Sequence, residues 1–156
     1  MPTQTTITTT GGPKTTKRKL RLYKKTALSE AIDEWHEKRL PDHFRPKATG
    51  LYRYKMRSRK YEEKKRRIHH HSNPLVYSGE TRFMATRSIQ ITATAKGVTG
   101  RIQVPKYIYM RRLGQPDLAS ELTRITRAEL KTIMAGVEAS LVEQINGEKE
   151  RTVEIV

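Results

Sequence analysis

The chain has 156 residues, and its 32 lysines and arginines outnumber 16 aspartates and glutamates, which gives a formal net charge of +16. An apolar fraction of 35% supports one modest core, and the charge predicts an anionic partner: nucleic acid, an acidic protein surface or a membrane surface. The absence of cysteine excludes disulfides and thiolate zinc sites, and no apolar run approaches the ~18 residues that span a bilayer.

The charge is distributed unevenly along the chain. Residues 1–25 hold seven basic residues and no acidic one, and residues 45–71 hold eleven basic residues against two acidic ones. Residues 117–156 hold five basic and eight acidic residues, a net charge of −3. This polarity favours head-to-tail self-assembly in a ring or stack.

Residues 1–25 are predicted to form an extended basic arm, because they are rich in threonine and contain Gly11-Gly12-Pro13. Such an arm is typically ordered by a partner, and it can add a strand to a neighbouring subunit. It contains no hydrophobic stretch of the secretory type, so we expect a protein that stays in the cytosol or is assembled from it into a larger particle. Its candidate contact residues are Lys14, Lys17, Arg18, Lys19 and Arg21.

A helix is predicted over residues 27–39. Thr26 is a suitable N-cap, Leu28, Ala31, Ile32 and Trp35 have helical spacing, and Pro41 ends the helix. We interpret Trp35, the single tryptophan, as a residue of the core or of a subunit interface.

Residues 45–71 are predicted to be a basic surface segment, with a solvated helix over 57–68. Interleaved tyrosines (Tyr52, Tyr54, Tyr61) are compatible with base stacking, so either nucleic acid or an acidic protein can be the partner. His69-His70-His71 lacks the spacing of a metal site on one helix, so no metal is expected. The candidate contact residues are Arg45, Lys47, Arg53, Lys55, Arg57, Arg59, Lys60, Lys64, Lys65, Arg66 and Arg67.

Residues 75–110 are predicted to be a β region. Apolar and polar residues alternate from Ser88 to Val104 on either side of Lys96-Gly97, which indicates a hairpin with one apolar face. Residues 107–110 are either a further strand or a packed connector.

Residues 118–145 are predicted to be one long helix, because apolar residues recur near every 3.6 positions between the cap Asp117 and the stop signal Asn146-Gly147. We expect it to cover the apolar face of the hairpin. Residues 151–156 alternate as a short closing strand. The fold class is therefore α+β: a single domain over 26–156, with a small antiparallel sheet packed by the long C-terminal helix and the shorter N-terminal helix.

No catalytic signature is present: the chain has no P-loop, GxGxxG, HExxH or GxSxG pattern. We therefore expect neither an enzyme nor a cofactor-binding protein.

Two stretches, LPDHFRPKATGLYRYKMRSRKYEEKKRR and NPLVYSGETR, resemble the neck or tail-completion proteins that join head and tail in tailed bacteriophages. The resemblance covers roughly residues 40–145 and includes a turn from Pro74 through Gly79 to Arg82, in which Gly79 permits a positive φ. We expect Leu75, Val76 and Tyr77 to enter the sheet, and Arg82 to project beyond it.

The resemblance implies a structural subunit of the virion, assembled in the host cytoplasm, that forms a homo-oligomeric ring between the portal-side connector and the tail. It implies no catalysis and no cofactor, and the ring can lie along the double-stranded DNA conduit. The alternative functions are a ribosomal or other RNA-binding structural protein, which the basic composition favours, and a DNA-binding regulator.

Overall fold

The computed structural model describes residues 16–94, 96–110 and 113–151. In chain order, the elements are α1 (Lys17–Lys38), the 3-10 helix η1 (Leu40–Phe44), α2 (Ala48–Leu51), α3 (Arg59–His69), α4 (Glu80–Arg87), β1 (Ile89–Ala93), β2 (Val98–Ile102), the 3-10 helix η2 (Lys106–Tyr109), α5 (Leu118–Leu122) and α6 (Arg127–Arg151). This mixture of helices and a two-stranded antiparallel sheet confirms the predicted α+β class. Among the described residues, no helix combines the length and the apolar character needed to cross a membrane.

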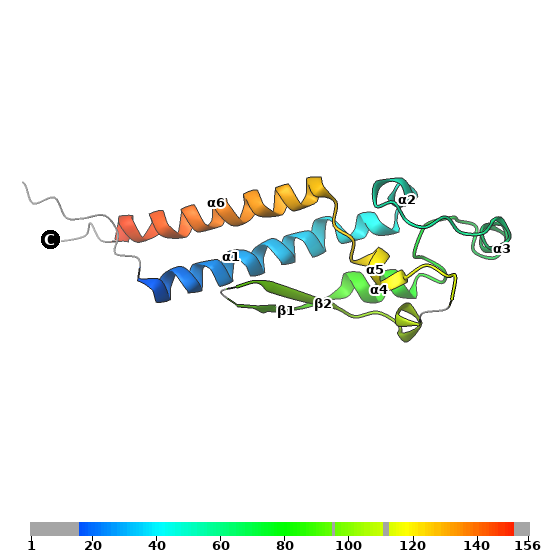
Figure 1. Ribbon diagram of the computed structural model, residues 1–156, viewed down its shortest axis with the longest axis horizontal. Coiled ribbons are helices and arrows are strands. Elements are labelled where there is room, and N and C mark those ends of the chain that lie inside the picture. Colours follow the sequence, from blue (N-terminus) through cyan, green and yellow to red (C-terminus); the bar gives the residue numbers. More distant parts are fainter. Residues whose placement is uncertain (1–15, 95, 111–112, 152–156) are drawn as a thin grey trace, which may run out of the picture.

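Helix α1 is the middle layer of the elongated molecule, with α6 along one side and the β1–β2 hairpin along the other (Figure 1). Ala27 and Ala31 form a buried cluster with Val137 of α6, because their short side chains let the two helices approach closely. The prediction that the long C-terminal helix covers the hairpin is therefore wrong. Helix α1 covers the hairpin instead, because it has apolar residues on two sides: Ala27 and Ala31 face α6, and Ile32 faces the hairpin.

The hairpin itself is confirmed. Its antiparallel register runs from Ile89 opposite Ile102 to Ala93 opposite Val98, and its half-buried residues alternate with exposed ones along β1. The Thr94 hydroxyl accepts hydrogen bonds from the backbone N–H groups of Lys96 and Gly97, which stabilises the turn.

The main core lies between the C-terminal half of α1 and the elements η1, α4 and α5. Its buried residues come from α1, η1, the turn before α4, α4 and α5: Trp35, Leu40, Phe44, Val76, Ala85 and Leu122. Trp35 is thus a core residue, in agreement with the first of the two interpretations offered for it.

The predicted extended arm, residues 1–25, ends too late in the sequence, because α1 already begins at Lys17. Residues 17–25 are the first turns of α1, and Thr16 caps that helix by accepting a hydrogen bond from the Lys19 N–H. Lysine, arginine and leucine favour helix, and packing against α6 stabilises it further. Residues 1–15, with Lys14, lie outside the described residues.

The β region was also predicted too wide. Leu75, Val76 and Tyr77 do not enter the sheet, because a turn with positive φ at Leu75 and Gly79 leads directly into α4. Residues 106–109 form η2, so 107–110 is a packed connector and not a strand.

The helix predicted over 118–145 is two helices, α5 and α6, separated by residues 123–126. Helix α6 continues past Asn146-Gly147 to Arg151, so the predicted stop signal does not end it. Of the predicted closing strand, Arg151 belongs to α6, and residues 152–156 lie outside the described residues.

Gly100 provides a test of the contact between the hairpin and α1. A Cβ atom there would lie 2.6 Å from Ile89 Cδ1 and 3.0 Å from Ile32 Cγ2. Ile89 Cδ1 ends a flexible side chain and can move aside, whereas Ile32 Cγ2 is attached directly to its Cβ. We therefore expect Gly100→Ala to lower the free energy of unfolding by about 1 kcal/mol through overpacking, as measured by urea denaturation.

Gly97→Ala is the matched control, because a Cβ at Gly97 meets no atom within 4 Å. Its effect should stay within about 0.5 kcal/mol. Equal stability of the two variants would contradict the close packing of β2 against α1.

Candidate functional site

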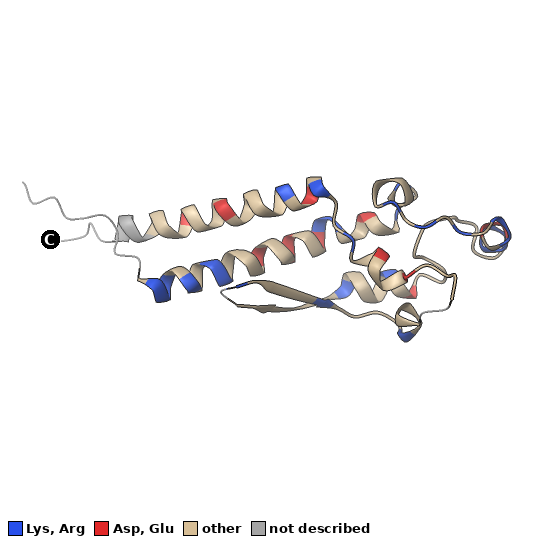
Figure 2. Cartoon of the chain, in the orientation of Figure 1, with Lys and Arg blue, Asp and Glu red and all other residues tan. Residues whose placement is uncertain are grey.

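The basic segment 45–71 lies at one end of the molecule, where α3 projects beyond the body, and lysines and arginines cover much of that helix (Figure 2). Helix α3 confirms the predicted solvated helix, displaced by one or two residues. Ser58 begins it by accepting a hydrogen bond from the Tyr61 N–H, and His70 ends it in the left-handed conformation. The eleven candidate cations nevertheless do not form one continuous surface.

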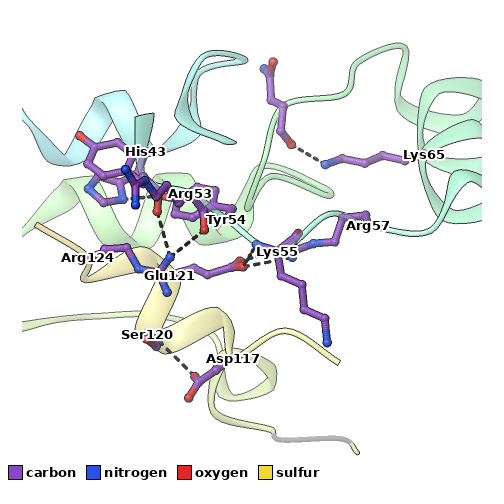
Figure 3. Close-up of polar contacts among 12 residues, drawn as sticks. His43, Arg53, Tyr54, Lys55, Arg57, Lys65, Asp117, Ser120, Glu121 and Arg124 are labelled. Carbon is purple, nitrogen blue, oxygen red and sulfur yellow. Dashed lines mark hydrogen bonds and ion pairs between the residues drawn. The ribbon is translucent and has the colours of Figure 1, made fainter. Parts of the chain in front are cut away.

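Three of these cations are structural. The Arg57 guanidinium forms two hydrogen bonds with the Glu121 carboxylate, at 2.5 and 3.2 Å, and only 4% of the Glu121 side chain is exposed. Glu121 also accepts the backbone N–H of Lys55 at 2.9 Å, while Lys55 Nζ donates to the Gly114 carbonyl. Figure 3 shows the Glu121 carboxylate joined by dashed lines to Lys55 and to Arg57. Lys65 is buried and donates to the Asn73 carbonyl, and burial lowers its pKa.

The other eight cations are exposed. Arg45 and Arg59 pair with Asp42 and Glu63 at the surface, where such pairs contribute little to stability. In the part of the chain that the structure describes, no hydrogen bond or ion pair is formed by the remaining side chains, which belong to Lys47, Arg53, Lys60, Lys64, Arg66 and Arg67.

Two of the three interleaved tyrosines are core residues and cannot stack on bases. Tyr52 and Tyr54 are 1% and 5% exposed. Tyr52 stacks on the His43 ring at 3.7 Å, and the Tyr54 hydroxyl pairs with His43 Nδ1 at 2.5 Å. Only Tyr61 keeps a partly exposed ring.

The Tyr52 hydroxyl donates to Glu129 Oε1 at 2.6 Å. Burial, together with this hydrogen bond, raises the pKa of Tyr52. Glu129 also accepts the Thr126 N–H, and the Thr126 hydroxyl accepts the Glu129 N–H. This reciprocal capping box begins α6. The signal Thr126-x-x-Glu129 is present in the sequence, but the apolar periodicity that continues through it obscured the break.

Arg124, which lies between α5 and α6, also binds the basic segment. Its guanidinium donates to the carbonyls of Tyr52 and Arg53 at 2.9 and 2.8 Å. Arg53 has a φ of 52°, a conformation that is costly for a residue with a Cβ. The two hydrogen bonds from Arg124 help to hold it.

A groove lies between α3 on one side and η2 with the start of α5 on the other. Two adjoining hollows, of about 350 and 620 Å³, share Met56, Tyr61, Tyr77, Tyr107 and Leu118 as lining residues. The three tyrosines are each about 40% exposed, and Met56 is 81% exposed. Sequence reasoning missed this groove because its lining comes from four separate segments.

The predicted turn motif supports the groove and the core. Pro74 lines the groove, Gly79 has a φ of 90° and begins α4, and Arg82 is exposed on that helix. Buried Thr81 pairs with the Tyr107 hydroxyl at 2.5 Å. The motif therefore positions one groove tyrosine instead of starting the sheet.

The described arm residues Lys17, Arg18, Lys19 and Arg21 are exposed on the first turns of α1, at the end of the molecule opposite α3 (Figures 1 and 2). The structure thus does not bring the two predicted basic groups together. The His69 ring lies beside the rings of Tyr77 and His71, and within the described residues no group of three potential metal ligands is formed.

Comparison of the chain with protein-family models, curated proteins and solved structures finds no match.

We expect the Arg57–Glu121 ion pair to hold the basic segment against α5. Arg57→Met leaves the Glu121 carboxylate buried without its counter-charge, so we expect a loss of about 3–5 kcal/mol in the free energy of unfolding. Arg59→Met, which breaks the exposed pair with Glu63, should cost less than about 1 kcal/mol. Chemical denaturation measures both, and equal losses would contradict a structural role for Arg57.

The buried His43 is expected to make stability depend on pH. Burial lowers its pKa from 6.5 to about 4, so between these values the unfolded chain binds a proton that the folded chain excludes. Stability should therefore fall by up to about 3 kcal/mol as the pH decreases from 6.5 to 4.

Urea unfolding of the wild type and of His43→Asn between pH 7.5 and 4 isolates this contribution, since shared carboxylate effects cancel in the difference. Tyr54→Phe removes the hydrogen bond but keeps the imidazole, so it should lower stability and retain the pH dependence. Parallel profiles for the wild type and His43→Asn would contradict the assignment.

Proposed function

We propose that this chain is a structural subunit of the head-to-tail junction of a tailed bacteriophage, where identical copies form a ring between the portal-side connector and the tail. The exposed apolar surface of α6 is the observation that supports self-assembly. The resemblance of residues 40–145 to neck and tail-completion proteins supports the head-to-tail junction as the place of assembly.

Helix α6 has apolar residues on two sides. Val137 is buried against α1, with Ile133 and Leu141 packed beside it. On the ridge formed by every fourth residue, Leu130, Met134 and Val142 are 52%, 50% and 57% exposed, interrupted by Glu138. The neighbouring Ala135 and Ala139 are also exposed.

Such a surface favours a second protein layer. The two exposed alanines continue the apolar surface past Glu138, and an exposed apolar patch on a soluble protein commonly marks an interaction site. Small residues such as these alanines also allow another backbone to approach closely. A second copy of the chain is the partner that a ring requires.

The exposed cations at the α3 end support the proposed position along the DNA path. Lys60, Lys64 and Arg67 can neutralise phosphates without base readout, and they suit an acidic portal surface equally well. The same residues favour RNA binding as a second candidate function, although the burial of Tyr52 and Tyr54 leaves it only one exposed tyrosine on the basic segment.

The ring proposal predicts that purified chain, after nuclease treatment, elutes as a discrete oligomer in size-exclusion chromatography with light scattering. Met134→Glu/Val142→Glu should shift it to a monomer with an unchanged circular dichroism spectrum, because both side chains are exposed and contribute little to the core. The oligomer should also bind a purified phage portal complex.

Leu51→Glu is the matched control, because Leu51 is 55% exposed at the end of α2, and this variant should remain oligomeric. A wild-type monomer that binds structured RNA tightly at high salt would contradict the proposal and support the RNA-binding alternative.

A further inference from the structure

The groove between α3 and η2 has the composition of a protein-binding surface. Its exposed lining includes three tyrosines and two methionines, residue types that are enriched at protein interfaces. Methionine adapts its shape to the side chain that it contacts, and both Met56 and Met110, at 81% and 61% exposed, line the larger hollow.

The groove is also cationic. Four cations and one carboxylate, Glu62, line it. Arg57 is neutralised by Glu121 and Lys65 is buried, so Lys55 and Arg66 are the two cations that a ligand can reach. The Lys55 ammonium donates to the Gly114 carbonyl, which sets its position before a ligand arrives. Such a groove fits a peptide that alternates apolar side chains with carboxylates.

A peptide of this type occurs in the chain itself. Residues 148–156 hold three acidic and two basic residues, a net charge of −1, and include the sequence Thr-Val-Glu-Ile-Val. If this sequence is extended when bound, Val153 and Ile155 point to one side and Glu154 to the other. The two aliphatic side chains would meet the tyrosines and methionines, and Glu154 would meet the cationic rim.

This segment cannot reach the groove of its own chain. Helix α6 has 25 residues and is therefore ~38 Å long, and its last turn and α3 lie at opposite ends of the molecule (Figure 1). The five residues from Thr152 to Val156 span at most ~18 Å when extended. The segment in the groove must therefore belong to another copy.

We propose that the groove binds residues 148–156 of a second copy of this chain. The inference rests on the proposed function as an assembling subunit and adds a specific contact to it. One end of each copy then contacts the opposite end of the next copy, and such head-to-tail contacts close into a ring when the rotation permits.

The receptor is the full-length Met134→Glu/Val142→Glu variant, so that the α6 surface does not drive assembly. It also carries Val153→Asp and Ile155→Asp, so that its own C-terminal residues do not compete for the groove. A fluorescein-labelled peptide of residues 148–156 is titrated with this protein and followed by anisotropy. We expect saturable binding that weakens at least tenfold when Met56→Glu and Met110→Glu are added. Leu51→Glu, outside the groove, should leave the affinity unchanged.

A peptide with Val153→Asp and Ile155→Asp, of the same length, should also bind at least tenfold more weakly. The proposal would be overturned if all the peptides bind equally, or if the groove substitutions leave the affinity unchanged. It would also be overturned if a labelled single-stranded oligonucleotide, and not the peptide, loses its binding in the groove variant. None of these results depends on ring formation, so this contact and the proposed function can fail separately.

Discussion

Two buried carboxylates determine how the basic segment lies on the rest of the molecule. Glu121 binds the Arg57 side chain and the Lys55 N–H, and Glu129 binds the Tyr52 hydroxyl. Burying a carboxylate costs several kcal/mol unless a cation and hydrogen-bond donors compensate it. These partners are 64 to 77 residues away in sequence, so residues 52–57 are held against α5 and the start of α6. The groove, α3 and the exposed cations all take their positions from this attachment.

The central position of α1 has a comparable consequence for the other half of the molecule. Because α1 contacts the hairpin on one side and α6 on the other, α6 packs mainly against α1 (Figure 1). Within the described residues, apolar side chains on the outer surface of α6 remain exposed. If α6 had covered the hairpin as well, more of the apolar residues of α6 would have been buried within the chain. The exposed ridge on α6 is thus a result of the layer order and not of the helix sequence alone.

The two surfaces that we propose for assembly differ in chemistry and in position on the molecule. The α6 ridge is apolar and lies along the side of the molecule, whereas the groove is aromatic and cationic and lies at the α3 end. In the proposed assembly, the contact between opposite ends of successive copies closes into a ring only where the rotation between copies permits it. The cations of α3 that remain exposed, such as Lys60 and Lys64, stay accessible to DNA or to an acidic protein.

The sequence by itself determined the elements whose signals lie within a few residues of one another. Alternation around Lys96-Gly97 predicted the hairpin, and the spacing of Ala31, Ile32 and Trp35 predicted most of α1. The capping box at Thr126 and Glu129 is a local signal of the same kind, but the predicted helix over 118–145 ran through it because the apolar period continues without interruption. Caps, turns and periodicity are interactions between near neighbours, so a sequence displays them directly.

Only the tertiary structure decided which charged and aromatic residues are available to a partner. Arg57 and Lys65 look the same in the sequence as Lys60 and Lys64, yet the first two are held by groups that other segments supply. Tyr52 and Tyr54 are buried because His43 and Glu129 lie beside them in space. The layer order and the groove likewise depend on contacts between distant segments, whose energies exist only once the chain has packed.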